Sequence, residues 1–524
     1  MKKYYHLFIT VCLILFSMFS CENTNTGSSV SEKYTPDWES LSKFNEAPEW
    51  FKDAKLGIYT HWGPQSLGNL GMENGAGWYG QQMYMENGAY DWKTGEIRLD
   101  SNGNPVESEA YTHHVKTYGD PSEFGYKDLI KLFKPDKFNA VEWADLFQKA
   151  GAKFAGPVAM HHDNYAMWDS DVTRWNIMDM AGFDATGELE NAIKGRGMKF
   201  LTSFHHAFTW VYYANSFKYD AKDPRYSDLY TDAHELTDFH PTKRFQDEWW
   251  AKLKEVIDKY EPDILWFDWW VQELDEEYRR NFMAYYFNKG IEWGKEVCAC
   301  YKNESFPAST GILDFERGRS NKITSKIWLT DTSTGPWFYR DNPDKKTANE
   351  LIDILIDIIS KNGCMLLNVP PNPDGSIPDY VKETLLEMGA WMNINGEAVY
   401  GTRPWTIFGE GPSKMARGGH KMEQNDLTYK PEDIRYVTKG DSVLYAFCLG
   451  APEKDVLMKA LSKDLMLMVD EIESVKMVGS DEEIRWTQDS EGLHISRPMH
   501  SPSDIAIAFK IQLNVTGGDV YEGF

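Results

Sequence analysis

The segment 263–270 (DILWFDWW) has the pattern of a buried β-strand that ends at a polar group. Four consecutive apolar residues precede Asp268, whereas a strand with one face in water alternates apolar and polar residues. Residues 245–260 (FQDEWWAKLKEVIDKY) carry apolar positions at steps of three and four, which is typical of an amphipathic helix. A helix followed by a doubly buried strand predicts one unit of an α/β fold with a parallel sheet.

Seven other short apolar runs share this pattern: 55–62 (KLGIYTHW), 153–163 (KFAGPVAMHHD), 199–206 (KFLTSFHH), 296–303 (EVCACYKN), 311–318 (GILDFERG), 326–332 (KIWLTDT) and 364–371 (CMLLNVPP). Helical patterns over 140–150 and 348–361 separate some of them. Eight buried strands alternating with helices predict a (β/α)8-like (TIM) barrel over residues 45–404. The fifth and sixth runs are only seven residues apart, too few for a crossover helix, so we expect an irregular barrel there.

The sequence pattern changes after Trp405. Residues 432–449, 472–487 and 491–512 show short alternating runs broken by Gly, Asp and Ser. This pattern predicts a C-terminal antiparallel β-sandwich over 405–524.

The N-terminal residues 1–20 have a basic start and an apolar stretch too short for a membrane span, which predicts a signal peptide. Cys21 follows Met18-Phe19-Ser20, which resembles the cleavage box of bacterial lipoproteins. We therefore expect a lipid on Cys21, a flexible tether over 21–44, and a lipoprotein in the periplasm or on the outer-membrane surface of a Gram-negative bacterium. The lipid is the only membrane contact expected.

The composition excludes some partners. The 524 residues include 55 basic and 80 acidic side chains, a formal net charge of −25, so a nucleic-acid partner is not expected. Aromatic residues make up 14% of the chain. Their flat faces suit sugar rings, but a large aromatic core accounts for most of them.

The predicted strands end in a specific set of polar residues. In a (β/α)8 barrel the carboxyl ends of the strands face a common pocket. The first six strands bring there His61, then His161, His162 and Asp163, then His205, then Asp268, Lys302 and Glu316. Two carboxylates on different strands in a histidine-rich, aromatic mouth suit glycoside cleavage.

Each of these groups also has an alternative interpretation. Asp268 could be a strand-end cap or an ion-pair partner, and Glu316 could form a surface pair with Arg317. His161, His162 and Asp163 could be a metal site, as in amidohydrolase-like barrels. Against a metal, only one imidazole, His61, follows the first strand, where those enzymes have His-x-His.

Five separated segments carry a family resemblance: 50–64 (WFKDAKLGIYTHWGP), 161–170 (HHDNYAMWDS), 263–268 (DILWFD), 362–378 (NGCMLLNVPPNPDGSIP) and 395–405 (NGEAVYGTRPW). Together they resemble glycoside hydrolase family 29, the α-L-fucosidases, over about residues 45–405.

The resemblance implies a retaining exo-glycosidase that removes terminal α-L-fucose from oligosaccharides or glycoconjugates without a metal or organic cofactor. It implies that Asp268 is the nucleophile and that Glu316, in 314–318 (DFERG), is the acid/base. Substrate-binding residues are expected at His61, Trp78, His161, His162, His205, Trp266, Trp269 and Lys302. The oligomeric state stays open.

The chain departs from the family pattern at four places. Gly77-Trp78-Tyr79 stands where Glu-Trp-Tyr is frequent, and Glu73 is a candidate replacement for the missing carboxylate. The other departures are Ser203-Phe204-His205 for Tyr-Tyr-Ser, Lys302 for a sugar-binding Arg, and Trp269-Trp270 for Gly-Gly. The Trp pair would narrow the pocket or add a stacking platform. An α-L-galactosidase, a modified-fucose glycosidase and a catalytically silent carbohydrate-binding relative therefore stay open.

Overall fold

The computed structural model describes residues 33–515 except 73–77, 87, 89–95, 107, 416, 422–427 and 469. The predicted signal peptide, Cys21, Glu73 and Gly77 lie outside the described residues. From Tyr34 onward the chain forms one compact unit. Within the described part, no helix has both the length and the apolar character that a membrane span requires.

Eight parallel strands close into a barrel in chain order, as predicted. They are β1 (Leu56–Thr60), β2 (Phe154–Met160), β3 (Lys199–Phe204), β4 (Ile264–Phe267), β5 (Cys298–Lys302), β6 (Ile312–Asp314), β7 (Trp328–Ser333) and β8 (Gly363–Val369). Nearly every strand residue is buried, because side chains fill the interior and helices cover the outside.

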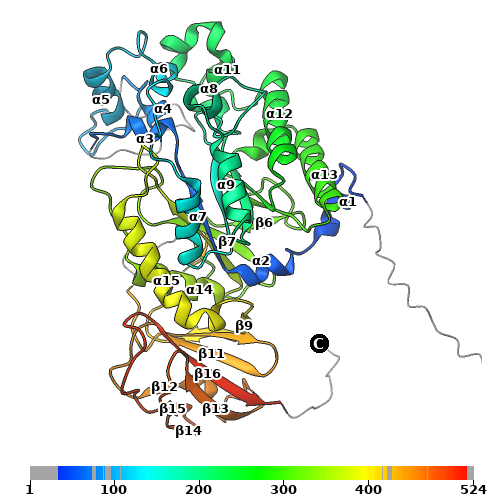
Figure 1. Ribbon diagram of the computed structural model, residues 1–524, viewed down its shortest axis with the longest axis vertical. Helices are drawn as coiled ribbons and strands as arrows, with labels where there is room; N and C mark the ends of the chain where they lie inside the picture. Colours follow the sequence, from blue (N-terminus) through cyan, green and yellow to red (C-terminus); the bar gives the residue numbers. More distant parts are fainter. Residues whose placement is uncertain are drawn as a thin grey trace, which may run out of the picture. The chain divides into compact units, whose positions relative to one another are not determined.

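Long helices surround the barrel (Figure 1): α7 (Ala140–Lys149), α9 (Ala185–Lys194), α12 (Lys243–Tyr260), α13 (Glu276–Trp293), α14 (Ala348–Ile359) and α15 (Asp379–Val399). The Thr242 hydroxyl caps α12 by accepting from the Phe245 N–H, and Thr347 with Glu350 forms a capping box on α14. No helix lies between β5 and β6, which confirms the predicted irregularity, and none lies between β6 and β7 in this fully described part of the chain.

Shorter helices lie before the barrel and in its loops. They are α1 (Trp38–Leu41), α2 (Glu49–Ala54), α3 (Pro64–Gly68), α4 (Tyr79–Gln82), α5 (Glu109–Thr117), α6 (Tyr126–Ile130), α8 (Ile177–Ala181), α10 (Thr209–Tyr212) and α11 (Ser227–Tyr230), with 3-10 turns at Ser42–Phe44, Ser216–Lys218, Asp220–Lys222, Pro224–Tyr226 and Val271–Glu273.

The C-terminal region is a two-sheet antiparallel sandwich, as predicted. One sheet has the order β13-β16-β11-β10-β9, from Glu471–Met477, Ile507–Asn514, Val443–Cys448, Ile434–Lys439 and Arg403–Glu410. The other has the order β12-β15-β14, from Val456–Met458, Leu493–Ile495 and Trp486–Gln488. The sheets share an apolar core that includes Tyr436, Met458 and Phe509.

The sandwich packs directly on the barrel through α14 and α15 (Figure 1). The Trp391 indole donates to the Ala506 carbonyl at 2.7 Å, and Tyr445 and Phe447 belong to the same apolar core as the barrel helices. The first sandwich strand begins at Arg403, two residues before the predicted boundary at 405. Barrel and sandwich are therefore one structural unit.

The predicted tether over 21–44 is wrong for residues 34–44. The Tyr34 N–H donates to Asn288 Oδ1 at 2.8 Å, and Asn288 Nδ2 donates back to the Tyr34 carbonyl. The rings of Tyr34 and Phe44 lie 5.0 and 5.2 Å from Phe287 of α13. Aromatic side chains bury enough apolar surface to hold this segment on the barrel, which Ser and Gly could not do.

Candidate active site

Four histidines form one side of a pocket at the carboxyl ends of β1, β2 and β3. The rings of His161 and His205 lie 4.6 Å apart, those of His161 and His162 4.2 Å apart, and those of His61 and His205 5.0 Å apart. All four side chains are buried. The sequence prediction that these residues share one mouth is therefore confirmed by their positions.

Each ring is oriented by a neighbour. His61 Nδ1 lies 2.8 Å from Asn368 Oδ1, and His161 Nδ1 lies 2.7 Å from Gln65 Nε2. His162 Nδ1 donates to the His205 carbonyl at 2.8 Å. Burial holds the pKa of His61 and His161 well below the usual range and lowers that of His162 to about 3. Neutral rings can donate and accept, as sugar hydroxyls require.

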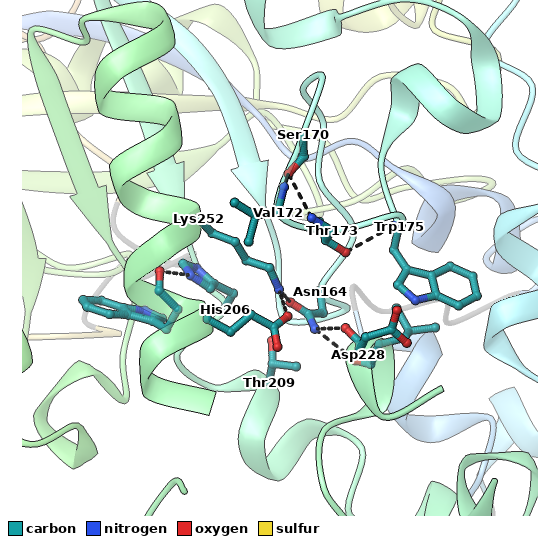
Figure 2. A network of polar contacts seen from close by, with 12 residues as sticks. Asn164, Ser170, Val172, Thr173, Trp175, His206, Thr209, Asp228 and Lys252 are labelled. Carbon is teal, nitrogen blue, oxygen red and sulfur yellow. Dashed lines mark hydrogen bonds and ion pairs between the residues drawn. The ribbon is translucent and has the colours of Figure 1, made fainter. Parts of the chain in front are cut away.

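A polar network behind the pocket fixes the loop that carries His161 and His162 (Figure 2). Asn164 turns the chain after β2 with a φ of 61°, a left-handed conformation that Asn tolerates. Its Nδ2 donates to the carbonyls of Asp228 and Leu229, and Lys252 of α12 donates to its Oδ1 at 2.7 Å (Figure 2). The Thr209 hydroxyl donates to the His162 carbonyl at 2.7 Å.

The opposite side of the pocket is a cluster of carboxylates around one ammonium group. Lys302 Nζ lies 3.0 Å from Asp268 Oδ1, 3.4 Å from Glu316 Oε2 and 3.2 Å from Asp331 Oδ2. Oδ2 of Asp268 faces the histidines, 3.1 Å from His205 Nδ1 and 3.4 Å from His162 Nε2. The two carboxylates predicted from the sequence are thus neighbours.

The shared ammonium limits how far apart these carboxylates are. Asp268 Oδ1 and Glu316 Oε2 cannot be separated by more than the sum of their distances to Lys302 Nζ, 3.0 and 3.4 Å. For these two oxygens the limit is compatible with the about 5–5.5 Å separation of the carboxyl groups in retaining glycosidases.

The environment separates the acidities of the two carboxyl groups. Burial alone would raise the pKa of Asp268, but the Lys302 charge and the His205 contact hold it well below its usual range. Burial raises the pKa of Glu316, and the nearby charges of Asp331 and Asp268 add to this, against Lys302. Asp268 is therefore the ionised group and Glu316 the one that keeps a proton longer.

The pocket is a cavity of ≈130 Å³ lined by His61, Trp78, His161, His162, His205, Phe208, Asp268, Trp269, Lys302, Glu316, Asp331, Trp337, Phe338 and Lys421. Every predicted site residue except Trp266 is in this lining. Binding sites for drug-sized ligands hold about 300–1,000 Å³. A cavity of this size suits one sugar ring.

Trp266 and Trp270 are not part of the pocket lining. Trp266 is fully buried and outside the pocket lining, and its ring lies 4.7 Å from Lys302 Nζ, so the predicted sugar contact at Trp266 stays a prediction. Trp269 lines the pocket, whereas Trp270 is buried against Phe208 and Phe239 with a φ of 81°. Of the Trp pair, only Trp269 offers a stacking surface.

Sequence reasoning missed Asp331 and the residues from the sandwich. Asp331 lies in the predicted strand 326–332 (KIWLTDT), and a charged residue inside a buried strand was an available signal. Lys421 lies between β9 and β10, and its N–H donates to the Glu316 carbonyl at 2.7 Å. His420 Nδ1 accepts from the Glu316 N–H at 3.1 Å. No spacing in the sequence connects these residues to the barrel.

Two groups of described side chains have the spacing of metal ligands. They are His61, His161 and His205, and His162, His205 and Asp268, each with ligand atoms within 4.8 Å of one another. Asp163, part of the alternative metal site, belongs to neither, because its Oδ2 accepts from the Tyr126 hydroxyl at 2.6 Å. The absence of a metal therefore stays a prediction, and the metal alternative narrows to these two groups.

A closed parallel barrel with two carboxylates of opposite acidity beside a pocket of sugar-ring size defines a glycoside hydrolase. A family model described as alpha-L-fucosidase matches residues 22–397, and one described as alpha-L-fucosidase C-terminal domain matches residues 424–514. The chain belongs to the α-L-fucosidase family, glycoside hydrolase family 29.

Individual relatives agree over nearly the whole chain. The tissue alpha-L-fucosidase of Rattus norvegicus is 29% identical over 515 residues, 94% of this chain and 95% of the relative. The alpha-L-fucosidase of Dictyostelium discoideum is also 29% identical, over 82% of this chain and 83% of the relative. The structure of Thermotoga maritima alpha-fucosidase in complex with fucose is 26% identical, with a TM-score of 0.70, over 91% of this chain and all of that one.

Proposed function

We propose that this enzyme is an exo-acting, retaining α-L-fucosidase that removes terminal α-L-fucose from oligosaccharides or glycoconjugates. The observation that carries the proposal is the position of Lys302 between two carboxyl groups of opposite acidity, Asp268 with its pKa held low and Glu316 with its pKa raised. The fucose bound by the Thermotoga relative supports the choice of sugar.

In the first step, Asp268 attacks the anomeric carbon while Glu316 gives its proton to the glycosidic oxygen. The bond from that carbon to the leaving oxygen breaks, and an ester to Asp268 forms. In the second step, Glu316 takes a proton from water, the water oxygen attacks the same carbon, and Asp268 leaves as a carboxylate. Two inversions give net retention.

Lys302 suits both steps because the carboxyl pair carries one negative charge at each stage. Before the first step the charge is on Asp268, and after it the charge is on Glu316. Lys302 Nζ is within 3.4 Å of both groups, so it can stabilise either without moving far. Its own pKa is raised well above the usual range, since burial, which lowers it, is outweighed by Asp268, Asp331 and Glu316.

The histidines and the aromatic wall bind the sugar. His61, His161 and His162 face the cavity with neutral rings and pair with ring hydroxyls. Trp337 and Phe338 supply apolar surface for a methyl group such as that on C5 of fucose.

One experiment tests the assignment. Wild type and Asp268→Ala are incubated with 4-nitrophenyl α-L-fucoside and α-L-galactoside, and the first-formed anomer is followed by NMR. We expect wild type to release α-L-fucose first and to prefer the fucoside, and Asp268→Ala to be at least about 10³-fold slower. First release of the β-anomer would overturn retention. Preference for the galactoside would support the L-galactosidase alternative.

Chelation and binding separate the remaining alternatives. We expect full activity after dialysis against EDTA, and loss restored by a divalent metal would show that one of the histidine groups is a metal centre. Fucose binding by calorimetry without turnover of either glycoside would identify a silent carbohydrate-binding relative.

A further inference from the structure

The side of the pocket next to Glu316 is cationic. Lys421 lines the cavity, with its Nζ 4.6 Å from the Trp269 ring centroid. Arg317 follows Glu316 in the chain, and its guanidinium lies 4.5 Å from the ring of Trp337, another residue of the pocket lining. Since the general acid stands beside the leaving oxygen, both cations are close to the residue that faces the departing aglycone.

A second cavity begins directly behind Arg317. It has a volume of ≈550 Å³ and is lined by Arg317, Arg319, Gly335, Pro336, Arg340, Asp344, Lys345, Lys346, Asn349, Glu350, Asp353, Ile354, Thr428 and Tyr429, which we call the basic groove. The groove and the active-site pocket are adjacent, because neighbouring residues of the chain line one or the other. Glu316 lines the pocket and Arg317 the groove, and Trp337 lines the pocket and Pro336 the groove.

The groove has a positive balance in a strongly acidic chain. Five basic and three acidic side chains line it, whereas the whole chain has a net charge of −25. Two of the three carboxylates have other roles: Glu350 accepts from the N–H and hydroxyl of Thr347, and Asp344 is fully exposed, 3.6 Å from Arg340. Burial raises the pKa of the third, Asp353, to about 7, so it is only partly ionised at neutral pH.

The guanidinium groups that line the groove are held in place by neighbours. Arg317 Nη2 donates to the Gly335 carbonyl at 2.8 Å, Arg319 Nη1 donates to the Tyr429 hydroxyl at 2.9 Å, and Arg340 Nη2 lies 3.6 Å from Asp344. Arg319 is 3% exposed, and its Nε, like that of Arg340, is buried with no hydrogen-bond partner among the described residues. Guanidinium groups bind carboxylate and sulfate oxygens with two parallel hydrogen bonds, and they prefer these planar or tetrahedral anions to neutral hydroxyls.

We propose that the basic groove is an aglycone subsite for an anionic sugar, so that the enzyme prefers fucose linked to a glycan that carries a sulfate ester or a carboxylate. The proposal rests on the proposed fucosidase function and names the substrate class of that site. Trp269 and Lys421 bind the sugar next to the scissile bond, and Arg340 and Lys345 reach the anionic group farther on.

The test compares aglycones within one enzyme preparation. The substrates are fucosyl disaccharides whose second sugar is neutral, sulfated or a uronic acid, with 4-nitrophenyl α-L-fucoside as the general assay. We expect kcat/KM for at least one anionic substrate to exceed that of the neutral disaccharide by about tenfold or more at low salt. The ratio should fall toward one at high ionic strength, since the Debye length shrinks to about 3 Å at 1 M.

The variant Arg340→Gln/Lys345→Gln removes two groove charges. It should lower the anionic-to-neutral ratio at least about threefold, and this ratio does not depend on the fraction of enzyme that is folded. The matched control, Lys382→Gln/Lys476→Gln, removes the same charge from exposed positions on α15 and β13 and should leave the ratio unchanged.

Two results would overturn the subsite without affecting the fucosidase assignment. One is equal kcat/KM for anionic and neutral disaccharides, and the other is an unchanged ratio in the groove variant. If no fucoside is hydrolysed at all, the proposed function fails. The subsite is then judged by calorimetry with the sulfated and the uronic acid sugars alone, for which wild type should bind and the groove variant should not. Absence of binding by wild type would overturn it.

Discussion

Lys302 is the residue on which the chemistry of the site depends most. It touches three carboxylates, and its Nζ lies 4.7 Å from the centroid of the Trp266 ring, so its charge is held in one place. An Arg at this position would bind by a planar fork, whereas the Lys ammonium is a compact charge. In this chain that compact charge sits within reach of Asp268 and Glu316 together.

Removing the Lys302 charge should lower the catalytic rate of the folded enzyme. We expect Lys302→Met to lower kcat/KM for 4-nitrophenyl α-L-fucoside about 10²–10³-fold, because neither carboxylate keeps its counter-charge during the reaction. Lys302→Arg should recover a large part of the loss. Lys322→Met, at an exposed position, is the control. Activity of Lys302→Met within threefold of wild type would contradict this role.

The opposite pKa shifts of Asp268 and Glu316 predict the pH dependence. The reactive form has Asp268 ionised and Glu316 protonated. Activity is therefore lost as the pH falls through the lowered pKa of Asp268, and again as it rises through the raised pKa of Glu316. A profile of kcat/KM against pH should show an alkaline limb above the ordinary Glu pKa of about 4.3.

The alkaline limb can be assigned by substitution. In Glu316→Gln the alkaline limb should be absent. The value of kcat/KM should fall by about 10²-fold or more, since no proton reaches the leaving group. Glu304→Gln, on the exposed β5–β6 loop, should keep the full profile. If the limb persists in Glu316→Gln, the general acid is another group, and Asp331 is the next carboxylate in the pocket.

At the scale of elements, α12 stabilises the site from outside the barrel. Lys252 is 2% exposed and joins Glu248, at 2.6 Å, to Asn164 in the loop after β2. We expect Lys252→Met to lower the free energy of unfolding by about 2 kcal/mol, because the buried Asn164 Oδ1 loses its donor and Glu248 loses its nearer cation. Urea unfolding followed by Trp fluorescence measures this.

The same helix supplies the control for that measurement. Lys254→Met removes an exposed i,i+4 pair with Asp258 and should cost at most about 0.5 kcal/mol. Equal costs for the two variants would show that the network in Figure 2 contributes nothing beyond a surface pair.

Elements whose burial is set locally could be predicted from the sequence. The eight strands stood out because each is a short, continuous apolar run, and α12 and α14 because their apolar residues recur at helical spacing. Contacts between residues far apart in the sequence could not be predicted in this way. Examples are the contact of Tyr34 with α13 and the contact of Lys421 with Glu316, each of which joins residues more than a hundred positions apart.

At the scale of the molecule, the pocket belongs to both parts of the chain. Barrel strands supply the carboxylates, but residues 419–421, between β9 and β10, lie beside Glu316. Gly419 pairs with Arg319, His420 accepts from the Glu316 N–H, and Lys421 lines the pocket. The sandwich is therefore part of the active site as well as a covering for α14 and α15. A change in this segment alters the aglycone side without touching the barrel.

Whole-molecule organisation also bears on where the enzyme works. We propose that it is exported and anchored by a lipid on Cys21. The compact unit begins at Tyr34, and the twelve residues between the two positions could span at most about 40 Å. Anchoring should therefore leave the pocket unaffected.

In a Gram-negative host, radiolabelled palmitate should be incorporated into wild type and not into Cys21→Ala, while both hydrolyse 4-nitrophenyl α-L-fucoside with the same kcat/KM. Cys448→Ala, at a buried cysteine of the sandwich, is the control and should keep its label. Wild-type protein without label in the membrane fraction would contradict the anchor, and label in Cys21→Ala would place it elsewhere.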